Sequence, residues 1–289
     1  MKILFLGTGS IGQRHIRLLQ NHFDHELFAL RLETPKDLPG VTQLASWLRV
    51  EDVRPDVAFI CNPTHLHISS AIECAARGMA LFIEKPLDVY IFWLEVLRHH
   101  CRRWSLSPYI AYPLRFHPVI ETIRLFGIPE GVDKKRDIEI VCRTNLGTWR
   151  QYPTYSAHRK QGGGCLLELS HEIDYAQFLF GKIERIEGNI GRDESCTTTD
   201  AETWAYITLY HESGVVCDVR LDVFSGKEER FIRLGEHKLS IRVTDEIYLK
   251  QLHYFFNHLN DPGIMNGLDE AAELCTKILA FREAAWTRL

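Results

Sequence analysis

Short apolar segments alternate with amphipathic stretches over roughly the first 113 residues of the chain. This order, in which buried strands and helix-type spacing follow one another, is typical of a parallel sheet covered by helices. The pattern predicts strands at 2–7, 26–32, 56–61, 80–83 and 109–111, with helices at 11–23, 44–50, 65–76 and 90–104.

The pattern changes after Pro118. A helix at 119–126 precedes longer segments in which apolar and polar residues alternate, which is the period of strands with one buried face. One helix, at 166–180, interrupts them, and two more close the chain around the breaker NDPG at 260–263. The predicted strands are 137–143, 183–191, 202–211, 215–224, 230–235 and 239–243, and the last helices are 245–260 and 268–286.

A chain of 289 residues that is 45% hydrophobic and 25% charged has ordinary globular composition and suffices for one large domain or two ordinary ones, and we expect two. A net charge of −4 gives no long-range attraction to nucleic acid or to an anionic membrane surface, so neither is expected as a partner. No apolar run approaches the roughly 20 residues of a membrane span, and MKILFLGTGS is a poor signal peptide, so we expect a cytoplasmic protein. The eight cysteines lie singly and are expected to be reduced and buried.

GTGSIG at 7–12 fits the GxGxxG pattern between a predicted strand and helix. Gly7 permits the tight turn, Gly9 lets a pyrophosphate approach the backbone, and Gly12 lets the helix pack closely on the strand. A simple glycine-rich turn is the alternative, but the position at the first strand of a βαβ unit favours dinucleotide binding. The expected cofactor residues of this motif are Gly7, Thr8, Gly9, Ser10, Ile11 and Gly12.

The end of the second predicted strand bears on the choice of cofactor. An acid there binds the ribose 2′-hydroxyl of NAD, whereas an arginine pairs with the 2′-phosphate of NADP. Arg31 is nearest the expected place and Glu33 follows two residues later, which favours NADP over NAD. The alternative is that Arg31 only ends a strand in solvent.

CNPTHLH at 61–67 follows another buried strand and so lies at the cofactor edge of the sheet. Its two histidines have no further ligands at a recognisable spacing nearby, so we expect no metal site. The loop is instead expected to lie under the nicotinamide ribose, with His67 in a structural or cofactor-facing role. The cofactor residues predicted here are Cys61, Asn62, Pro63, Thr64 and His67.

EKPLD at 84–88 comes next, and with the two preceding motifs it resembles the glucose-fructose oxidoreductase, inositol dehydrogenase and MocA family of NAD(P)-dependent oxidoreductases. The resemblance implies that Lys85 faces the nicotinamide and the reacting oxygen of the substrate. It also implies a cis peptide bond before Pro86, with Glu84 pointing away from the substrate as part of the scaffold. Glu84, Lys85 and Pro86 are therefore assigned to the cofactor site.

The second half of the chain carries its own matches to this family. AYPLRFHP at 111–118 resembles the family's turn into the second domain and assigns Arg115 to cofactor and substrate binding. GGGCLLELSHEIDYAQFLFG at 162–181 resembles its active-site helix, on which His171 and Asp174 are neighbours at i, i+3. Glu168 departs from the aspartate that is common in the family, and HEIDY lacks the second histidine of a zinc protease helix.

The resemblance assigns catalysis to Lys85, His171 and Asp174. Oxidation of a secondary alcohol requires its hydroxyl proton to leave, and a histidine has a pKa suited to accepting it. Lys85 either moves that proton or steadies the charge on oxygen, and the sequence leaves the two alternatives open. Asp174 is expected to bind a second substrate hydroxyl or to orient His171.

The segment 147–161 offers aromatic and basic residues suited to a sugar, with Arg159 and Lys160 as further candidates. For each one, a solvated loop residue is the alternative. The sequence from YSA at 155–157 through GGG to LELSHEIDY resembles a branch of the family that acts on sugars of bacterial surface polysaccharides. The full set of expected substrate-binding residues is Lys85, Arg115, Trp149, Arg150, Tyr155, His171 and Asp174.

The predicted fold is α/β: a Rossmann doubly wound parallel sheet at 1–118, followed at 119–289 by an α+β domain with an open, largely antiparallel sheet for substrate binding and oligomerisation. The expected activity is hydride transfer between NADP or NAD and a CH–OH group of a sugar, amino sugar, sugar nucleotide or polyol. A homodimer or homotetramer through the second sheet is implied by the resemblance. The alternatives are a non-catalytic cofactor-binding sensor, and an enzyme that epimerises or cleaves glycosides with a tightly bound cofactor.

Overall fold

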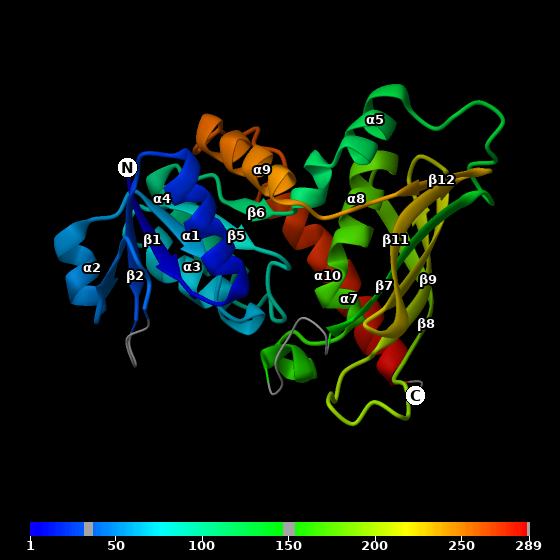
Figure 1. The fold of residues 1–289 in the computed structure, drawn as a ribbon, viewed down its shortest axis with the longest axis horizontal. Coiled ribbons are helices and arrows are strands. Elements are labelled where there is room, and N and C mark those ends of the chain that lie inside the picture. Colours follow the sequence, from blue (N-terminus) through cyan, green and yellow to red (C-terminus); the bar gives the residue numbers. More distant parts are fainter. Residues whose placement is uncertain (32–36, 147–153, 288–289) are drawn as a thin grey trace. The chain divides into compact units, whose positions relative to one another are not determined.

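The computed structural model describes residues 1–31, 37–146 and 154–287, and the chain forms two compact units (Figure 1). Unit 1 contains Met1–Ala111 and Tyr248–Ala272. Unit 2 contains Tyr112–Ile247 and the chain from Glu273 onward.

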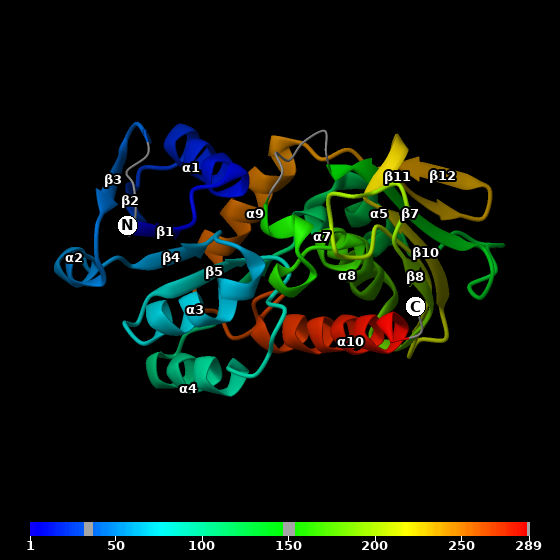
Figure 2. The ribbon, with the colours of Figure 1, turned by 90° about the horizontal axis from the view of Figure 1, so that it is seen from below.

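Unit 1 is built on a six-stranded parallel sheet in the order β3-β2-β1-β4-β5-β6. This is the doubly wound order, with its switch point between β1 and β4. Helices α1 and α9 cover one face and α3 and α4 the other (Figure 2). The strands are β1 (Lys2–Leu6), β2 (Glu26–Leu30), β3 (Val41–Leu44), β4 (Val57–Ile60), β5 (Ala80–Glu84) and β6 (Tyr109–Ala111). The helices are α1 (Ser10–His22), α2 (Trp47–Val53), η1 (Thr64–Leu66), α3 (His67–Ala75), α4 (Leu94–Trp104) and α9 (Asp245–Asn257).

The central strands of unit 1 are buried on both faces, as the continuous apolar runs predicted. An aromatic cluster joins the sheet to α9, because the ring of Phe255 lies edge-on to Phe59 and Phe82 at 6.0 and 5.2 Å between centroids. These contacts fix α9 on the sheet although it is far away in the sequence.

Unit 2 is built on a second six-stranded sheet, in the order β12-β11-β7-β10-β9-β8. Strands β7 and β10 run parallel and the other neighbours are antiparallel. The strands are β7 (Ile138–Asn145), β8 (Ile183–Gly191), β9 (Trp204–His211), β10 (Val216–Asp222), β11 (Phe224–Leu234) and β12 (His237–Ser240). The helical elements are η2 (Pro113–Phe116), α5 (Pro118–Phe126), η3 (Tyr155–Ala157), η4 (Arg159–Gln161), α7 (Cys165–Glu168), α8 (Ser170–Phe180) and α10 (Leu268–Trp286), which begins in unit 1.

Helices α7 and α8 pack on one face of the second sheet. Alternate residues of β9 and β10 are buried, and those between them are partly or fully exposed. The predicted fold class is therefore confirmed, including the alternation that indicated a sheet with one covered face.

The division into units differs from the expected boundary at residue 118 in one important respect. Residues 248–272, expected in the second domain, belong to unit 1. Gln251 donates a hydrogen bond to the Tyr109 hydroxyl at 3.1 Å, and the backbone N–H of Ile110 donates to the carbonyl of Asn266 at 3.1 Å. The chain thus returns to complete the first unit, which hydrophobic periodicity does not reveal.

Three local predictions were wrong. Strand β3 was not predicted: only its last residue, Leu44, fell within the helix predicted at 44–50, and the helix itself spans Trp47–Val53. The helix predicted from residue 90 begins at Leu94, because Asp88 accepts hydrogen bonds from the backbone of Val89 and Tyr90 and holds that segment in a turn. The helix predicted at 166–180 is broken at Leu169 into α7 and α8.

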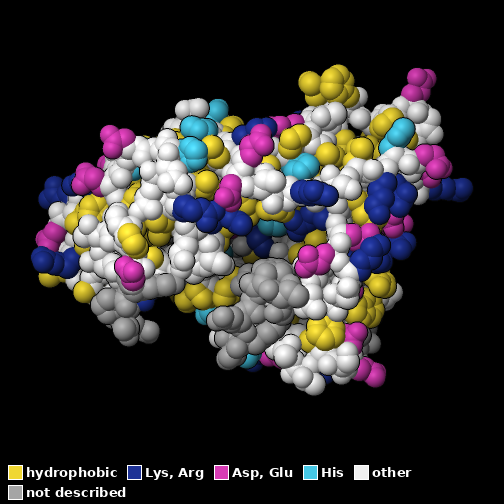
Figure 3. Space-filling model, in the orientation of Figure 1, with side chains coloured by type: hydrophobic (Ala, Val, Ile, Leu, Met, Phe, Trp, Pro, Cys, Tyr) yellow, Lys and Arg dark blue, Asp and Glu magenta, His cyan; other side chains and the backbone are white. Residues whose placement is uncertain are grey.

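All eight cysteines are free and buried, as expected. Within the described ranges, we find no helix that is both long enough and apolar enough to cross a membrane. Acidic and basic side chains are scattered together over the face shown in Figure 3, in keeping with the small net charge.

Candidate active site

The glycine turn after β1 has the geometry of a phosphate-binding loop. Gly7 has a φ of +98°, and a Cβ on it would lie 2.4 Å from the backbone of Cys61 and Asn62. A Cβ on Gly12 would lie 2.3 Å from the Gly7 carbonyl oxygen, whereas a Cβ on Gly9 would meet nothing within 4 Å. The first and third glycines therefore allow close packing, and the second leaves open space at the start of α1.

Helix α1 begins directly at this open space. Gly9 caps it without a side-chain hydrogen bond, and its first turn contains no acidic residue. Amide N–H groups at such a helix end attract an anion. The loop also contains Thr8, Ser10 and Ile11, the other residues of the GTGSIG motif. Its open backbone and helix end fit a dinucleotide phosphate.

Arg31 follows β2 and reaches the same loop. Its Nη1 donates a hydrogen bond to the Thr8 hydroxyl at 3.0 Å, so the guanidinium lies beside the glycine turn. Glu33, the other residue considered for cofactor choice, lies outside the described residues.

The loop after β4 is tied to the segment after β5 by one histidine. The two ring nitrogens of His67 lie 2.8 Å from the Pro86 carbonyl oxygen and 2.9 Å from that of Asn62. Burial lowers the pKa of His67, although the carbonyls and Asp88 act in the opposite direction. The structure thus gives His67 a role as a brace between two loops of the predicted cofactor site.

The remaining residues of that loop lie at the carboxyl end of β4. Asn62 donates a hydrogen bond to the Ser70 hydroxyl at 2.7 Å, and Cys61 and Thr64 are buried. Burial, with a smaller effect of the Glu84 charge, raises the pKa of the Cys61 thiol well above its usual value. Cys61 is therefore an unreactive packing residue beneath the glycine turn.

Lys85 stands at the carboxyl end of β5 and is half-buried. The Lys85–Pro86 peptide bond is cis, as the family resemblance implied. Glu84, the last residue of β5, turns inward: its Oε1 lies 2.7 Å from Nε2 of His15 on α1, and both side chains are buried. The inward orientation agrees with the expected scaffold role, and His15 is a partner that the sequence did not suggest.

A surface cavity of about 300 Å³ opens beside these two loops in unit 1. Tyr90, Phe92 and Trp93 give it aromatic walls, and these three side chains are exposed. His65 and Asp88 contribute polar lining, and none of these residues was predicted as part of a site.

His171 and Asp174 lie on α8 in unit 2, as predicted. The His171 ring is half-buried and stands edge-on to Tyr112, 5.7 Å between centroids. The Tyr112 hydroxyl donates to Ser170 at 3.4 Å, so this aromatic side chain supports the start of the helix.

Asp174 and Arg115 form a buried bidentate ion pair with each other. The guanidinium Nε and Nη2 donate to the two carboxylate oxygens at 2.9 and 2.6 Å, and the side chains are 1% and 0% exposed. The pair joins η2 to α8. Both residues were assigned separately to ligand binding, and their mutual pairing was not foreseen.

Glu172 lies on the side of α8 opposite to Asp174 and forms an ion pair of its own. Its carboxylate lies 2.8 Å from Nε of Arg230 on β11, and Arg230 also contacts the sulfur of Cys142. Burial raises the pKa of the Cys142 thiol to about 12. Ion pairs on two sides therefore fix the helix that carries His171.

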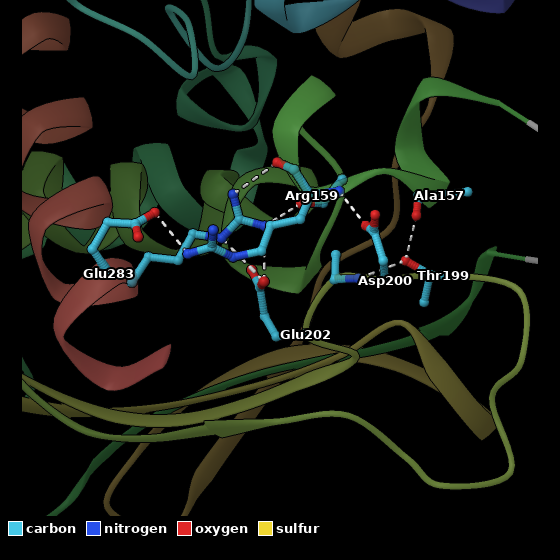
Figure 4. A network of polar contacts seen from close by, with 9 residues as sticks. Ala157, Arg159, Thr199, Asp200, Glu202 and Glu283 are labelled. Atoms are coloured by element: carbon cyan, nitrogen blue, oxygen red, sulfur yellow. Dashed lines mark hydrogen bonds and ion pairs between the residues drawn. The ribbon is translucent and has the colours of Figure 1, made fainter. Parts of the chain in front are cut away.

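The glycine loop before α7 is held by the C-terminal helix (Figure 4). Arg282 donates from Nε and Nη2 to one carboxylate oxygen of Glu202 at 3.0 and 2.8 Å, and also donates to the Gly163 carbonyl. Gly164 has a φ of +107°, and a Cβ there would collide with the Glu202 carboxylate. This buried ion pair sets the path of the chain into the active-site helix.

The predicted substrate segment is only partly described, because Trp149 and Arg150 lie outside the described residues. Tyr155 is half-buried in η3. Arg159 pairs with Glu283 at 2.6 Å (Figure 4). Its guanidinium also stacks over Trp286, while Lys160 is exposed. Glu168 accepts a hydrogen bond from Ser156 at 2.5 Å, which gives this departure from the family pattern a structural role in unit 2.

No group of three or more potential metal-ligating side chains occurs in the described part of the chain.

Comparison with known proteins gives two family models and several relatives. Residues 1–91 match the model described as "Oxidoreductase family, NAD-binding Rossmann fold", and residues 136–245 match "GFO/IDH/MocA C-terminal domain". Myo-inositol 2-dehydrogenase of Thermotoga maritima is 22% identical over 270 residues, covering 85% of this chain and 79% of the relative.

Solved structures share the fold along nearly the whole chain. Myo-inositol 2-dehydrogenase of Lactobacillus plantarum superposes with a TM-score of 0.83 at 16% identity, covering 100% of this chain and 98% of the other. The WlbA dehydrogenase of Thermus thermophilus, solved with NAD and UDP-GlcNAcA, gives 0.78 at 20% identity, covering 97% and 94%.

Proposed function

We propose, from the premise that this chain belongs to the GFO/IDH/MocA family of oxidoreductases, that it transfers a hydride between a nicotinamide cofactor and a CH–OH group of a carbohydrate-like substrate. The observation that carries the proposal is the glycine turn. Gly7 and Gly12 are packed against backbone while Gly9 faces open space at an uncapped helix end, which suits a dinucleotide phosphate.

The cofactor residues of the proposal lie in unit 1, apart from Arg115. A bound nicotinamide would supply the hydride acceptor or donor. The glycine turn would hold the pyrophosphate, the loops after β4 and β5 would flank the nicotinamide ribose, and Arg31 would bind the adenosine end. The proposed set is Gly7, Thr8, Gly9, Ser10, Ile11, Gly12, Arg31, Cys61, Asn62, Pro63, Thr64, His67, Glu84, Lys85, Pro86 and Arg115.

Arg31 supports a preference for NADP. Its guanidinium is placed beside Thr8 of the glycine turn, where it can pair with a 2′-phosphate by two parallel hydrogen bonds. NAD remains the competing cofactor of this family's Rossmann fold.

The catalytic assignment names Lys85 and His171 as the groups that serve the reacting oxygen. A histidine can accept the hydroxyl proton during oxidation and return it during reduction. An ammonium group at Lys85 would stabilise negative charge on the same oxygen. Whichever group holds the proton, the other is expected to orient the substrate.

Asp174 enters the proposal as the residue that orients His171, together with Arg115. Their bidentate pair supports this alternative over a direct hydrogen bond from a substrate hydroxyl to Asp174, because both carboxylate oxygens already accept from the guanidinium. Substrate contacts are proposed for Tyr155, Trp149 and Arg150.

The proposed substrate class is a sugar, amino sugar, sugar nucleotide or polyol, with surface-polysaccharide synthesis as the setting. The names of the relatives support the substrate class, since one is a myo-inositol dehydrogenase and another was solved with UDP-GlcNAcA. The names describe those relatives, and they define the panel of candidate substrates to be tested with this chain.

The proposal includes a cytoplasmic homodimer or homotetramer. Eight free cysteines suit a reducing compartment. The partly exposed face of the second sheet, which includes the half-exposed Tyr206, offers a surface for a second copy. Light scattering that gives the mass of one chain at micromolar concentration would reject the oligomer.

The first experiment is a titration of the full chain with NADPH and NADH, followed by the substrate panel monitored through absorbance of the reduced nicotinamide. We expect one nucleotide to bind and one class of the panel to be turned over, with turnover falling by about 10²-fold or more in Lys85→Ala. Failure to bind either nucleotide would reject the proposal. Turnover by Lys85→Ala at the wild-type rate would reject the assignment of Lys85.

A further inference from the structure

A buried histidine and glutamate lie beneath the proposed cofactor site of unit 1. His15 Nε2 and Glu84 Oε1 are 2.7 Å apart, and the residues are 0% and 7% exposed. His15 comes from α1, the helix that starts at the glycine turn, and Glu84 is the residue before Lys85. One contact therefore joins the phosphate-binding helix to the strand that ends in the proposed catalytic lysine.

The surroundings of His15 indicate where its proton lies. The rings of Phe59, Phe82 and Tyr248 stand edge-on around the imidazole at 5.7, 5.0 and 5.9 Å between centroids. Nδ1 has no hydrogen-bond partner among the described residues. A proton on Nδ1 would be a buried, unpaired donor, which costs more than an unpaired lone pair on that nitrogen. The favoured form is a neutral imidazole that donates from Nε2 to a carboxylate.

The pair consequently carries a net negative charge, whereas the buried Arg115–Asp174 and Arg282–Glu202 pairs of unit 2 each combine a cation with an anion. Its second carboxylate oxygen, Oε2, accepts the backbone N–H of Lys85 at 3.3 Å. The negative charge of Glu84 acts on Cys61, which follows the neighbouring strand β4: it adds to the effect of burial in raising the pKa of the Cys61 thiol. Cys61 lies directly under Gly7, so the carboxylate is close to the switch point of the sheet.

We propose that the Glu84–His15 pair sets the preference of the site for the oxidised over the reduced nicotinamide. The oxidised ring is positively charged and the reduced ring is neutral. Lys85 adds a second positive charge to the same edge of the sheet, which by itself disfavours the oxidised form. A buried carboxylate offsets that repulsion, since charges interact strongly where the dielectric is low.

His15 acts in this arrangement as a positioning residue. It provides a donor to the Glu84 carboxylate without adding a charge of its own. An arginine in its place would cancel the charge. The pair can act in this way only if unit 1 binds a nicotinamide nucleotide, as proposed above.

The test uses the nucleotide that the full wild-type chain binds and compares the dissociation constants of its oxidised and reduced forms. Calorimetry measures binding of the oxidised form, and fluorescence measures binding of the reduced form. Glu84→Gln should raise the ratio Kd(oxidised)/Kd(reduced) on the order of threefold to tenfold, because the charge is lost while the shape is kept. His15→Gln retains an N–H donor and should keep the ratio near the wild-type value.

Two further variants keep the test decisive. Phe82→Leu disturbs the packing around His15 without changing a charge, and should leave the ratio unchanged. The double variant His15→Leu with Glu84→Leu replaces both partners by apolar residues, which buried pairs often tolerate, and should shift the ratio as Glu84→Gln does.

An unchanged ratio in folded Glu84→Gln, or in the double variant where the single one does not fold, overturns the inference. An equal shift in Phe82→Leu also overturns it, because packing would then be the cause. If wild-type chain binds no nicotinamide nucleotide, the proposed function itself fails, which is a distinguishable result.

Discussion

At the scale of single residues, buried carboxylates hold nitrogen donors that come from distant segments of the chain. Glu84 holds His15, Asp174 holds Arg115, and Glu202 holds Arg282. Removing one partner of such a pair leaves a buried charge without compensation and typically costs about 3–5 kcal/mol. The residues beside the proposed chemistry therefore contribute to stability as well as to function.

Arg31 provides a test of cofactor choice at this scale. Arg31→Ala removes the guanidinium beside Thr8, so kcat/KM with NADPH should fall by about tenfold or more while the value with NADH changes little. Steady-state kinetics with both nucleotides measures the two values. Arg49→Ala, which removes an exposed arginine of α2, is the control and should change neither. Equal effects on both nucleotides in Arg31→Ala would contradict the NADP assignment.

His67 makes a pH dependence of stability predictable. Burial lowers its pKa in the folded state, so below about pH 6.5 the unfolded chain takes up a proton that the folded chain does not. The free energy of unfolding should therefore fall as the pH drops through that region, and it should recover at higher pH. His211, whose pKa burial also lowers, acts in the same direction.

Urea unfolding at about pH 8 and about pH 5.5 measures this effect. His67→Gln should reduce the loss of stability between the two pH values by on the order of 1 kcal/mol. His22→Gln changes an exposed histidine at the end of α1 and should retain the wild-type pH dependence. A pH dependence that is the same in His67→Gln and in wild type would show that His67 does not cause it.

At the scale of elements, α8 is held on two sides by ion pairs, from Arg115 on η2 and from Arg230 on β11. Asp174→Asn leaves Arg115 buried without a charged partner. We expect a loss of about 3–5 kcal/mol in the free energy of unfolding and a fall in kcat through displacement of His171. The glycine turn of unit 1 is not altered, so the variant should still bind nucleotide.

Kinetics of Asp174→Asn with separate kcat and KM, together with nucleotide titration, measures this prediction. Arg124→Gln removes another cation over the Phe178 ring, 5.3 Å from its centroid, and serves as the matched control with wild-type kcat. A large rise in KM with kcat unchanged would contradict a positioning role and would indicate that Asp174 binds substrate directly.

Much of this element-scale description was accessible from the sequence. Strand β6 and helix α10 have the predicted bounds, and GxGxxG was placed between a strand and a helix because local spacing determines both. The break at Leu169 and the start of α4 at Leu94 were not accessible, because they depend on contacts such as those of Asp88 with the backbone of Val89 and Tyr90.

Pairings between residues far apart in the sequence likewise could not be predicted from the sequence. Arg115 and Asp174 were each recognised, but they lie 59 positions apart in the sequence and no local pattern signals that they meet. His15 did leave a trace, since it lies three residues after Gly12 on the buried face of α1 with Ile16 and Leu19. A polar residue within an apolar stripe needs a partner, and that reasoning, applied to the sequence, leads to a search for a buried carboxylate.

At the scale of the whole molecule, the chain passes between its two units more than once. Residues 248–272 return to unit 1, and α10 begins in unit 1 and ends in unit 2. Its last turns supply Arg282, which fixes the glycine loop before α7 (Figure 4). One element therefore takes part both in the cofactor-binding unit and in the support of the helix that carries His171.

Net hydride transfer is the central claim, and deuterium at the reactive C4 position of the reduced nucleotide tests it most directly. The labelled nucleotide is incubated with the oxidised form of the compound identified in the panel, and the product is analysed by mass spectrometry and NMR. We predict one deuterium on the new carbinol carbon, with loss of reduced nicotinamide in equal amount. A sensor would leave the label on the nucleotide, and an enzyme with a permanently bound cofactor would form product without label. Either result would contradict the account.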